Sequence, residues 1–88
     1  MQLETSSRFD RLFKKLPRAL QEKALEKQKI FSENPFDPRL ETHKLKGKET
    51  PHWAFSIDEK NRIKFLSLGG DRVELVFVGP HDQAYKKR

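Results

Sequence analysis

The chain has 88 residues and a formal net charge of +6, from 19 Lys and Arg against 13 Asp and Glu. A chain of this length buries only about 60 to 65% of the surface that it exposes when unfolded. This excludes two separate cores, and we expect a single domain over residues 1–88. The chain has no cysteine, which excludes a disulfide framework, a cysteine zinc site and a thiol nucleophile. The positive charge favours a polyanionic partner, and nucleic acid before a membrane surface.

The sequence carries no sign of a membrane segment. No apolar run approaches the roughly 18 residues that a membrane-spanning helix needs. Residues 1–5, Met-Gln-Leu-Glu-Thr, lack the basic start and apolar stretch of a signal peptide. We therefore expect a cytoplasmic protein that has no membrane partner.

The first part of the chain has the period of amphipathic helices. A short helix is predicted from apolar residues at i, i+3, i+4 and i+7, namely Phe9, Leu12, Phe13 and Leu16. Ser7, with Asp10 three residues later, predicts the N-terminal cap of this helix. Pro17 suits the first turn of a second helix, which Asn34-Pro35 should end. These elements predict two helices in tandem, arranged as a hairpin.

The remainder of the chain predicts a connector followed by strands. Residues 34–51 contain three prolines and show no period, so we expect an exposed connector. From Trp53 onward apolar residues alternate with polar ones, which predicts three antiparallel strands with turns at 58–61 and 69–71. Residues 3–5 offer a further edge strand.

Helices followed by hairpins predict an α+β fold, with the N-terminal helix hairpin packed on one face of a small, mainly antiparallel three- to four-stranded sheet. If Ile63 and Phe65 point toward the helices, alternation sends Arg62 and Lys64 to the other face. A basic surface suited to a phosphate backbone would then lie on that side of the sheet.

Four segments together resemble one known family. They are Lys15-Leu16-Pro17, His43-Lys44-Leu45-Lys46-Gly47, the strand pair 53–57 with 62–65, and the ending 78–85. In order and spacing they resemble the RelE/ParE superfamily of type II toxins, and within it the RelE/YafQ-like messenger-RNA endonucleases. This resemblance implies a RelE-like fold and a toxin of a toxin-antitoxin system. It also implies the activity of an mRNA interferase, a ribosome-dependent and metal-independent endoribonuclease that cuts mRNA at the A site and inhibits translation.

The resemblance also implies residues for the chemistry. His81 matches a C-terminal catalytic histidine and is expected to be the general acid, although a surface histidine that ends a strand is the alternative. His43 matches a histidine of the same loop and is expected to be a second proton-transfer group; the alternative is a loop histidine bonded to backbone. No carboxylate matches the family clearly, because Asp58, Glu59 and Asp82 all lie near the right segments. The general base therefore stays open.

The expected cations and the aromatic residue follow from the same match. Lys44 and Lys46 correspond to the basic loop and are expected to face the scissile phosphate, or else to be solvated surface lysines. Arg62 corresponds to the catalytic arginine, with a structural salt bridge to Glu59 or Glu74 as the alternative. Tyr85 is expected to stack on a base, or else to anchor the C-terminal segment by packing.

Partners follow from the family. We expect a cognate acidic antitoxin whose disordered segment wraps the basic surface, together with the ribosome and mRNA. No cofactor is expected, and the spacing of the three histidines does not suggest a metal site. Two other functions stay open. One is a ParE-like toxin that inhibits gyrase by binding alone, and the other is a non-catalytic relative that binds antitoxin or RNA.

Overall fold

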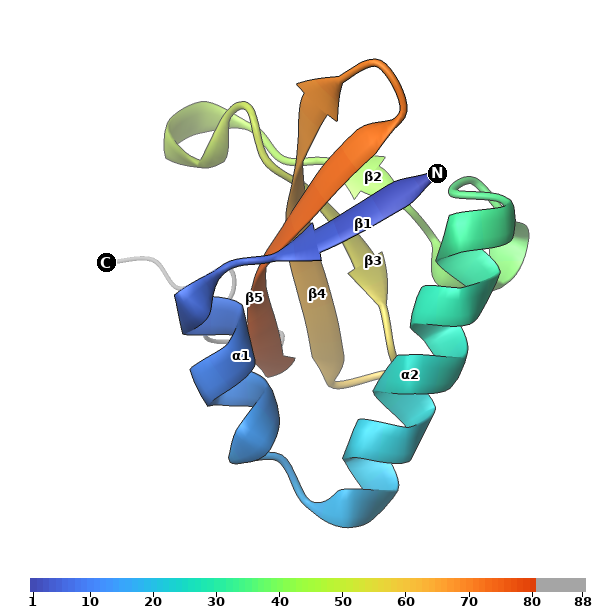
Figure 1. Cartoon of the computed structure of the whole chain (residues 1–88), viewed down its shortest axis with the longest axis vertical. Coiled ribbons are helices and arrows are strands. Elements are labelled where there is room, and N and C mark those ends of the chain that lie inside the picture. The colour runs from blue at the N-terminus through green and yellow to red at the C-terminus, as the bar shows by residue number, and fades with distance from the viewer. Residues whose placement is uncertain (81–88) are drawn as a thin grey trace.

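The computed structural model describes residues 1–80 and has two helices packed on one five-stranded sheet (Figure 1). The helices are α1 (Ser7–Lys14) and α2 (Arg18–Glu33), and short 3-10 turns lie at η1 (Pro38–Leu40) and η2 (Gly47–Glu49). The strands are β1 (Gln2–Thr5), β2 (His43–Lys44), β3 (Trp53–Ser56), β4 (Asn61–Gly69) and β5 (Arg72–Pro80), in the spatial order β1-β5-β4-β3-β2. The α+β class is confirmed, with five strands instead of three or four.

The two additional strands form the edges of the sheet. β1 pairs in parallel with β5, so that Leu3 lies beside Val73, and this confirms the edge strand predicted at residues 3–5. β2 pairs antiparallel with β3. The prediction of an exposed connector over 34–51 was therefore wrong at β2, whose backbone is paired, and at Leu40 and Leu45, which are buried. A strand of two residues is too short to show an alternating period, which explains why the sequence pattern did not reveal it.

The start of α1 differs by one residue from the prediction. The Ser6 side chain, not that of Ser7, accepts the hydrogen bond from the Phe9 backbone N–H at 3.0 Å. Ser6 has an extended backbone because its own N–H donates to the Leu75 carbonyl at 3.0 Å, which continues the pairing of β1 with β5. An extended residue directly before a helix is the one that caps it.

The junction between the helices is fixed by side chains and by proline geometry. Pro17 occupies the N-cap position of α2 and not its first turn. The Gln21 amide Nε2 reaches back to donate to the Phe13 carbonyl at 3.0 Å. This bond satisfies a carbonyl in the last turn of α1 and ties the two helices together.

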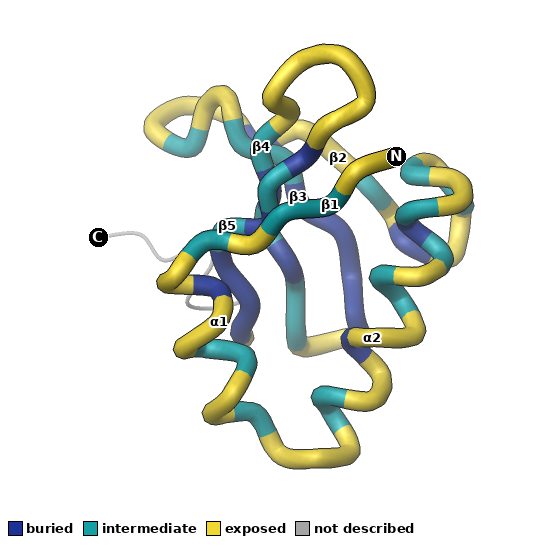
Figure 2. The backbone as a smooth tube through the Cα atoms, viewed as in Figure 1, coloured by how far each residue is buried: buried dark blue, intermediate teal, exposed yellow. Residues whose placement is uncertain are grey.

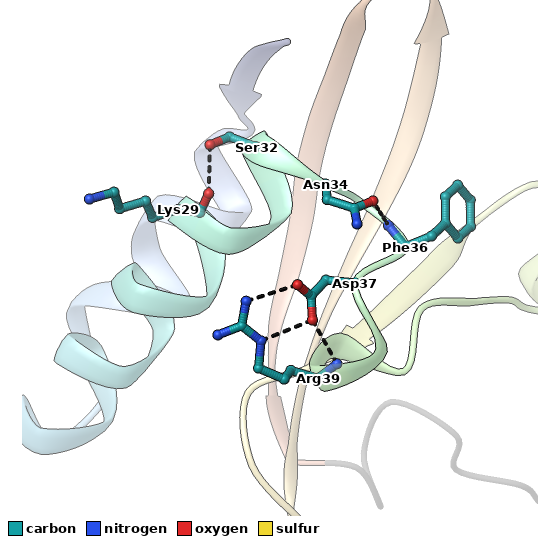
Figure 3. A network of polar contacts seen from close by, with 6 residues as sticks. All are labelled: Lys29, Ser32, Asn34, Phe36, Asp37 and Arg39. Carbon is teal, nitrogen blue, oxygen red and sulfur yellow. Dashed lines mark hydrogen bonds and ion pairs between the residues drawn. The ribbon is translucent and has the colours of Figure 1, made fainter.

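A network of polar contacts turns the chain at the end of α2 (Figure 3). The Asn34 side chain accepts a hydrogen bond from the Phe36 N–H at 3.1 Å. Arg39 donates to the Asp37 carboxylate from Nε at 2.9 Å and from Nη2 at 2.8 Å, and its backbone N–H donates at 2.9 Å. These bonds from Arg39 lower the pKa of Asp37 to about 2. The turn directs Leu40 into the core and the following chain toward β2.

The core lies between the helices and the sheet, as the dark segments of β3, β4 and β5 show in Figure 2. Phe31 of α2 stacks on Phe55 with ring centres 4.5 Å apart and meets Phe65 edge-on at 4.7 Å. Ile63 and Phe65 are buried in this core, as predicted. Within residues 1–80, neither helix is long and apolar enough to cross a membrane.

Candidate functional site

The side of the sheet that faces away from the helices carries the candidate site. Because side chains alternate along a strand, the neighbours of the core residues point to this side. The register aligns His43 with Ala54, Ala54 with Lys64, and Lys64 with Phe77. A second row aligns Ser56 with Arg62 and Arg62 with Gly79. We call this side the helix-free face, defined by His43, Ala54, Ser56, Arg62, Lys64, Phe77 and Gly79.

Two of the predicted site residues share this face. His43 lies two strands from Lys64, so their backbones are about 10 Å apart, and Arg62 lies two residues along β4, about 7 Å from Lys64. Lys44 is aligned instead with Trp53, whose ring packs against the core, so Lys44 lies on the opposite side from His43. Lys46 is exposed immediately before η2.

His43 is oriented by the backbone of Glu41. Its Nδ1 lies 3.0 Å from the Glu41 carbonyl oxygen. A carbonyl only accepts hydrogen bonds, so Nδ1 carries the proton, and the neutral ring has its lone pair on Nε2. Glu41 itself has a positive φ of 52°, a conformation that is uncommon outside glycine. Its carboxylate accepts a hydrogen bond from the Ser56 hydroxyl at 3.1 Å.

Arg62 stabilises the turn between β3 and β4. Its Nη1 donates to the carbonyls of Asp58 at 2.8 Å, Asn61 at 3.2 Å and Glu59 at 3.4 Å. Within residues 1–80 it forms no salt bridge with Glu59 or Glu74. The salt bridge considered as the alternative for Arg62 is therefore not found among the described residues, and Arg62 contacts backbone carbonyls instead. Nε and Nη2 make no hydrogen bond within the same residues.

Lys64 is paired, which changes the expected basic surface. Its Nζ lies 2.9 Å from Glu49 Oε1, and the Lys64 side chain is only 13% exposed. It also lies 5.0 Å from the centre of the Phe77 ring, while the Arg8 guanidinium lies 5.3 Å from the same ring. The helix-free face is therefore a mixed cluster of cations, carboxylates and one aromatic ring.

The sequence analysis missed Glu41, Glu49, Phe77 and Arg8 as neighbours of the site. Glu49 lies 15 residues from Lys64 in the chain, and Arg8 comes from α1, far from Lys64 and Phe77 in the sequence. No local spacing links these residues. A positive φ is usually indicated in a sequence by glycine. Glu41 has this conformation without being glycine, so the sequence gives no signal for it either.

Among the carboxylates considered as the general base, Asp58 has a structural role. Asp58 is engaged in the turn, where its Oδ1 accepts the N–H groups of Lys60 at 2.9 Å and Asn61 at 2.8 Å. Partial burial would raise the pKa of Asp58, but these bonds and the Asn61 amide outweigh it and lower the pKa. His81, Asp82 and Tyr85 lie outside the described residues. In residues 1–80, no three His, Asp or Glu side chains form a group that could hold a metal ion.

No family model matches the chain, and no curated protein matches it. Solved structures do match. The YoeB/ParE toxin from Agrobacterium tumefaciens is 19% identical, with a TM-score of 0.77 over 92% of this chain and 99% of that one. YafQ from E. coli is 12% identical, with a TM-score of 0.78 over 96% of this chain and 97% of that one.

RelE in the RelE–RelB complex from Pyrococcus horikoshii is 14% identical, with a TM-score of 0.71 over 90% of this chain and 92% of that one. Like the two toxins above, it aligns along nearly the whole length of both chains. These likenesses support the resemblance that the four sequence segments indicated. The chain therefore has the fold of the RelE/ParE toxins.

Proposed function

We propose that the chain is the toxin of a type II toxin-antitoxin system and acts in the cytoplasm as a ribosome-dependent, metal-independent endoribonuclease. It would cut mRNA at the A site and so inhibit translation. The observation that carries this proposal is the presence of His43 and Arg62 on one face of a toxin fold, within about 10 to 15 Å of each other by strand spacing.

Cleavage of RNA without a metal has three requirements. A base removes the proton of the 2′-hydroxyl, and the 2′-oxygen then attacks phosphorus. Cations stabilise the charge that builds on the phosphate oxygens. An acid gives a proton to the departing 5′-oxygen, which leaves a 2′,3′-cyclic phosphate and a 5′-hydroxyl.

His43 suits the role of the base. Its Nδ1 donates to the Glu41 carbonyl, so in the neutral ring the lone pair is on Nε2, the form that accepts a proton. His81 is the proposed acid, by its match to the family's C-terminal histidine. Tyr85 is proposed to stack on a base of the RNA.

The cations have different proposed roles. Arg62 is held by three backbone carbonyls through Nη1, which orients the planar guanidinium so that Nε and Nη2 can bind a phosphate in two places. Lys46 is proposed to contact the RNA backbone. Lys44 lies on the opposite side of the sheet from His43, and we propose for it the longer-range attraction of a polyanion.

A cognate antitoxin is the proposed protein partner. Two of the structural neighbours are a RelE–RelB complex and a YoeB–YefM toxin-antitoxin complex. The net charge of +6 suits an acidic segment that folds on binding. An acidic partner would compete with RNA for the same cations.

The test is cleavage of a programmed mRNA on ribosomes, with mapping of the cut ends. The wild type should cut within the A-site codon and leave a 2′,3′-cyclic phosphate. His43→Ala and His81→Ala should each slow cleavage by about 100-fold or more, the usual range for a positioned acid or base. Lys29→Gln, a change on the exposed surface of α2, serves as the control and should cut as the wild type does.

Two results would contradict this proposal. One is intact mRNA together with inhibited gyrase supercoiling, which would favour a ParE-like toxin. The other is intact mRNA together with antitoxin binding alone, which would favour a non-catalytic relative. Cleavage that both histidine variants retain in full would refute the assigned roles.

A further inference from the structure

The roles proposed above leave one largely covered cation of the helix-free face, Lys64, unused. Lys64 is a central residue of that face, since it lies on β4 between β3 and β5. Lysine usually extends its ammonium into water, but the Lys64 side chain is only 13% exposed. Its ammonium is therefore held at the sheet surface, on the same face as Arg62 and His43.

An aromatic ring helps to hold it there. The Lys64 Nζ lies 5.0 Å from the centre of the Phe77 ring, which is within the range of a cation–π contact. The ring lies over Gly79, where an added Cβ would come within 3.0 Å of its Cζ. The absence of a side chain at residue 79 thus lets Phe77 lie flat beside Lys64.

Glu49 supplies the anion that Lys64 contacts. The backbone of Glu49 is anchored on both sides, because its N–H donates to the Lys46 carbonyl at 3.3 Å and its own carbonyl accepts from His52 N at 2.7 Å. The His52 ring donates to the same carbonyl from Nδ1 at 2.9 Å. The 3-10 turn η2 therefore presents the Glu49 carboxylate to Lys64 in a defined position.

This contact is suited to exchange. The Glu49 side chain is 39% exposed, so solvent reaches this ion pair from the side of the carboxylate and weakens it. A phosphate oxygen offers the same negative charge and hydrogen-bond acceptor as the carboxylate oxygen that now lies 2.9 Å from Nζ. Two further cations are close by. Arg62 lies two residues from Lys64 on β4, and the Arg8 guanidinium contacts the ring of Phe77 on β5.

We propose that Lys64 binds a phosphate oxygen of single-stranded RNA. Glu49 is a positioning residue, whose carboxylate occupies the phosphate position beside Lys64 Nζ until RNA displaces it. The proposal rests on RNA as the substrate class of the proposed function. It does not rest on the cleavage step.

The test measures binding without chemistry. A fluorescent oligoribonucleotide with 2′-O-methyl groups has no nucleophile, so anisotropy reports affinity alone, from about 50 to 200 mM salt. Loss of one phosphate contact reduces the slope of log K against log salt by about 0.7 for a single strand. Lys64→Gln should show this smaller slope and weaker binding, and Lys64→Arg should restore the wild-type slope.

The variants of Glu49 distinguish binding from a structural role. Glu49→Gln keeps an acceptor for Lys64 but removes the competing charge, so it should tighten binding about 3-fold and steepen the slope. The same change in a Lys64→Gln background should have no effect. Lys29→Gln, which removes an equal charge from α2, should leave the slope closer to that of the wild type than Lys64→Gln does.

Two results would overturn the inference. One is an unchanged slope in Lys64→Gln protein whose circular dichroism shows that it is folded. The other is a Glu49→Gln effect that persists without Lys64. If the wild type fails to cut mRNA but the Lys64 and Glu49 effects are coupled, the proposed function fails and the inference stands. If the wild type cuts mRNA but the slopes of the variants do not change, the proposed function stands and the inference fails.

Discussion

Phe31 should be among the most costly side chains to truncate. It is fully buried and contacts both Phe55 and Phe65 through its ring. Replacing a buried Phe by Ala costs about 3 to 5 kcal/mol, because the transfer free energy is lost and a cavity remains. A chain of this length has a total stability of about 4 to 13 kcal/mol. Phe31→Ala should therefore remove roughly a quarter or more of the free energy of unfolding.

Urea unfolding gives the measurement. With an m-value of about 2 kcal/mol per M, the midpoint should fall by about 1.5 to 2.5 M. The protein has a single tryptophan, and Trp53 stacks on Phe65 at 6.2 Å, so its fluorescence reports on the same core. Far-UV circular dichroism provides the second probe.

Phe36→Ala is the matched control. Phe36 is 63% exposed, and its ring lies edge-to-face with that of Trp53, with ring centres 5.8 Å apart. The same change of side chain should cost less than about 1 kcal/mol there. Equal losses for the two variants would refute the argument that the ring cluster under α2 holds this fold together.

Three further predictions concern local contacts. Ser6→Ala should cost about 1 kcal/mol in urea unfolding and speed hydrogen exchange at the Phe9 amide; no change would contradict Ser6 as the cap. The lowered pKa of Asp58 means that its stabilisation is present above the ordinary value of 3.8 and is lost as the pH falls through the lower folded value. Asp58→Ala should therefore be less stable than the wild type at pH 7, and the gap should shrink in acid; a gap that grows in acid would reverse the sign. Gly79→Ala should cost about 1 to 3 kcal/mol, because the new Cβ would meet Phe77 at 3.0 Å; a neutral result in thermal unfolding would show that the ring moves freely.

The sequence was most informative where apolar residues repeat over several turns or strands. Phe9, Leu12 and Phe13 pack in or against the core as the helical period predicted, and Ile63 with Phe65 indicated which face of β4 meets the helices. Periodicity works there because burial on one face constrains every second or third residue.

The sequence was least informative where a feature depends on a residue that is distant in the chain. The choice of Ser6 over Ser7 as the cap depends on Leu75, nearly seventy positions away along the chain. The pairing of Lys64 with Glu49 depends on how η2 folds back over the sheet. Such contacts are set by tertiary structure, which no local pattern of charges records.

The parallel pairing of β1 with β5 also shapes how the protein can form. Leu3 cannot find Val73 until nearly all of the described chain has been synthesised, since these residues pair across the whole fold. Until then the growing polypeptide has a bare β4 edge and a first strand with no neighbour, a state prone to association with other chains. Premature termination before residue 72 would thus give fragments that cannot complete the sheet, and we expect proteases to remove them.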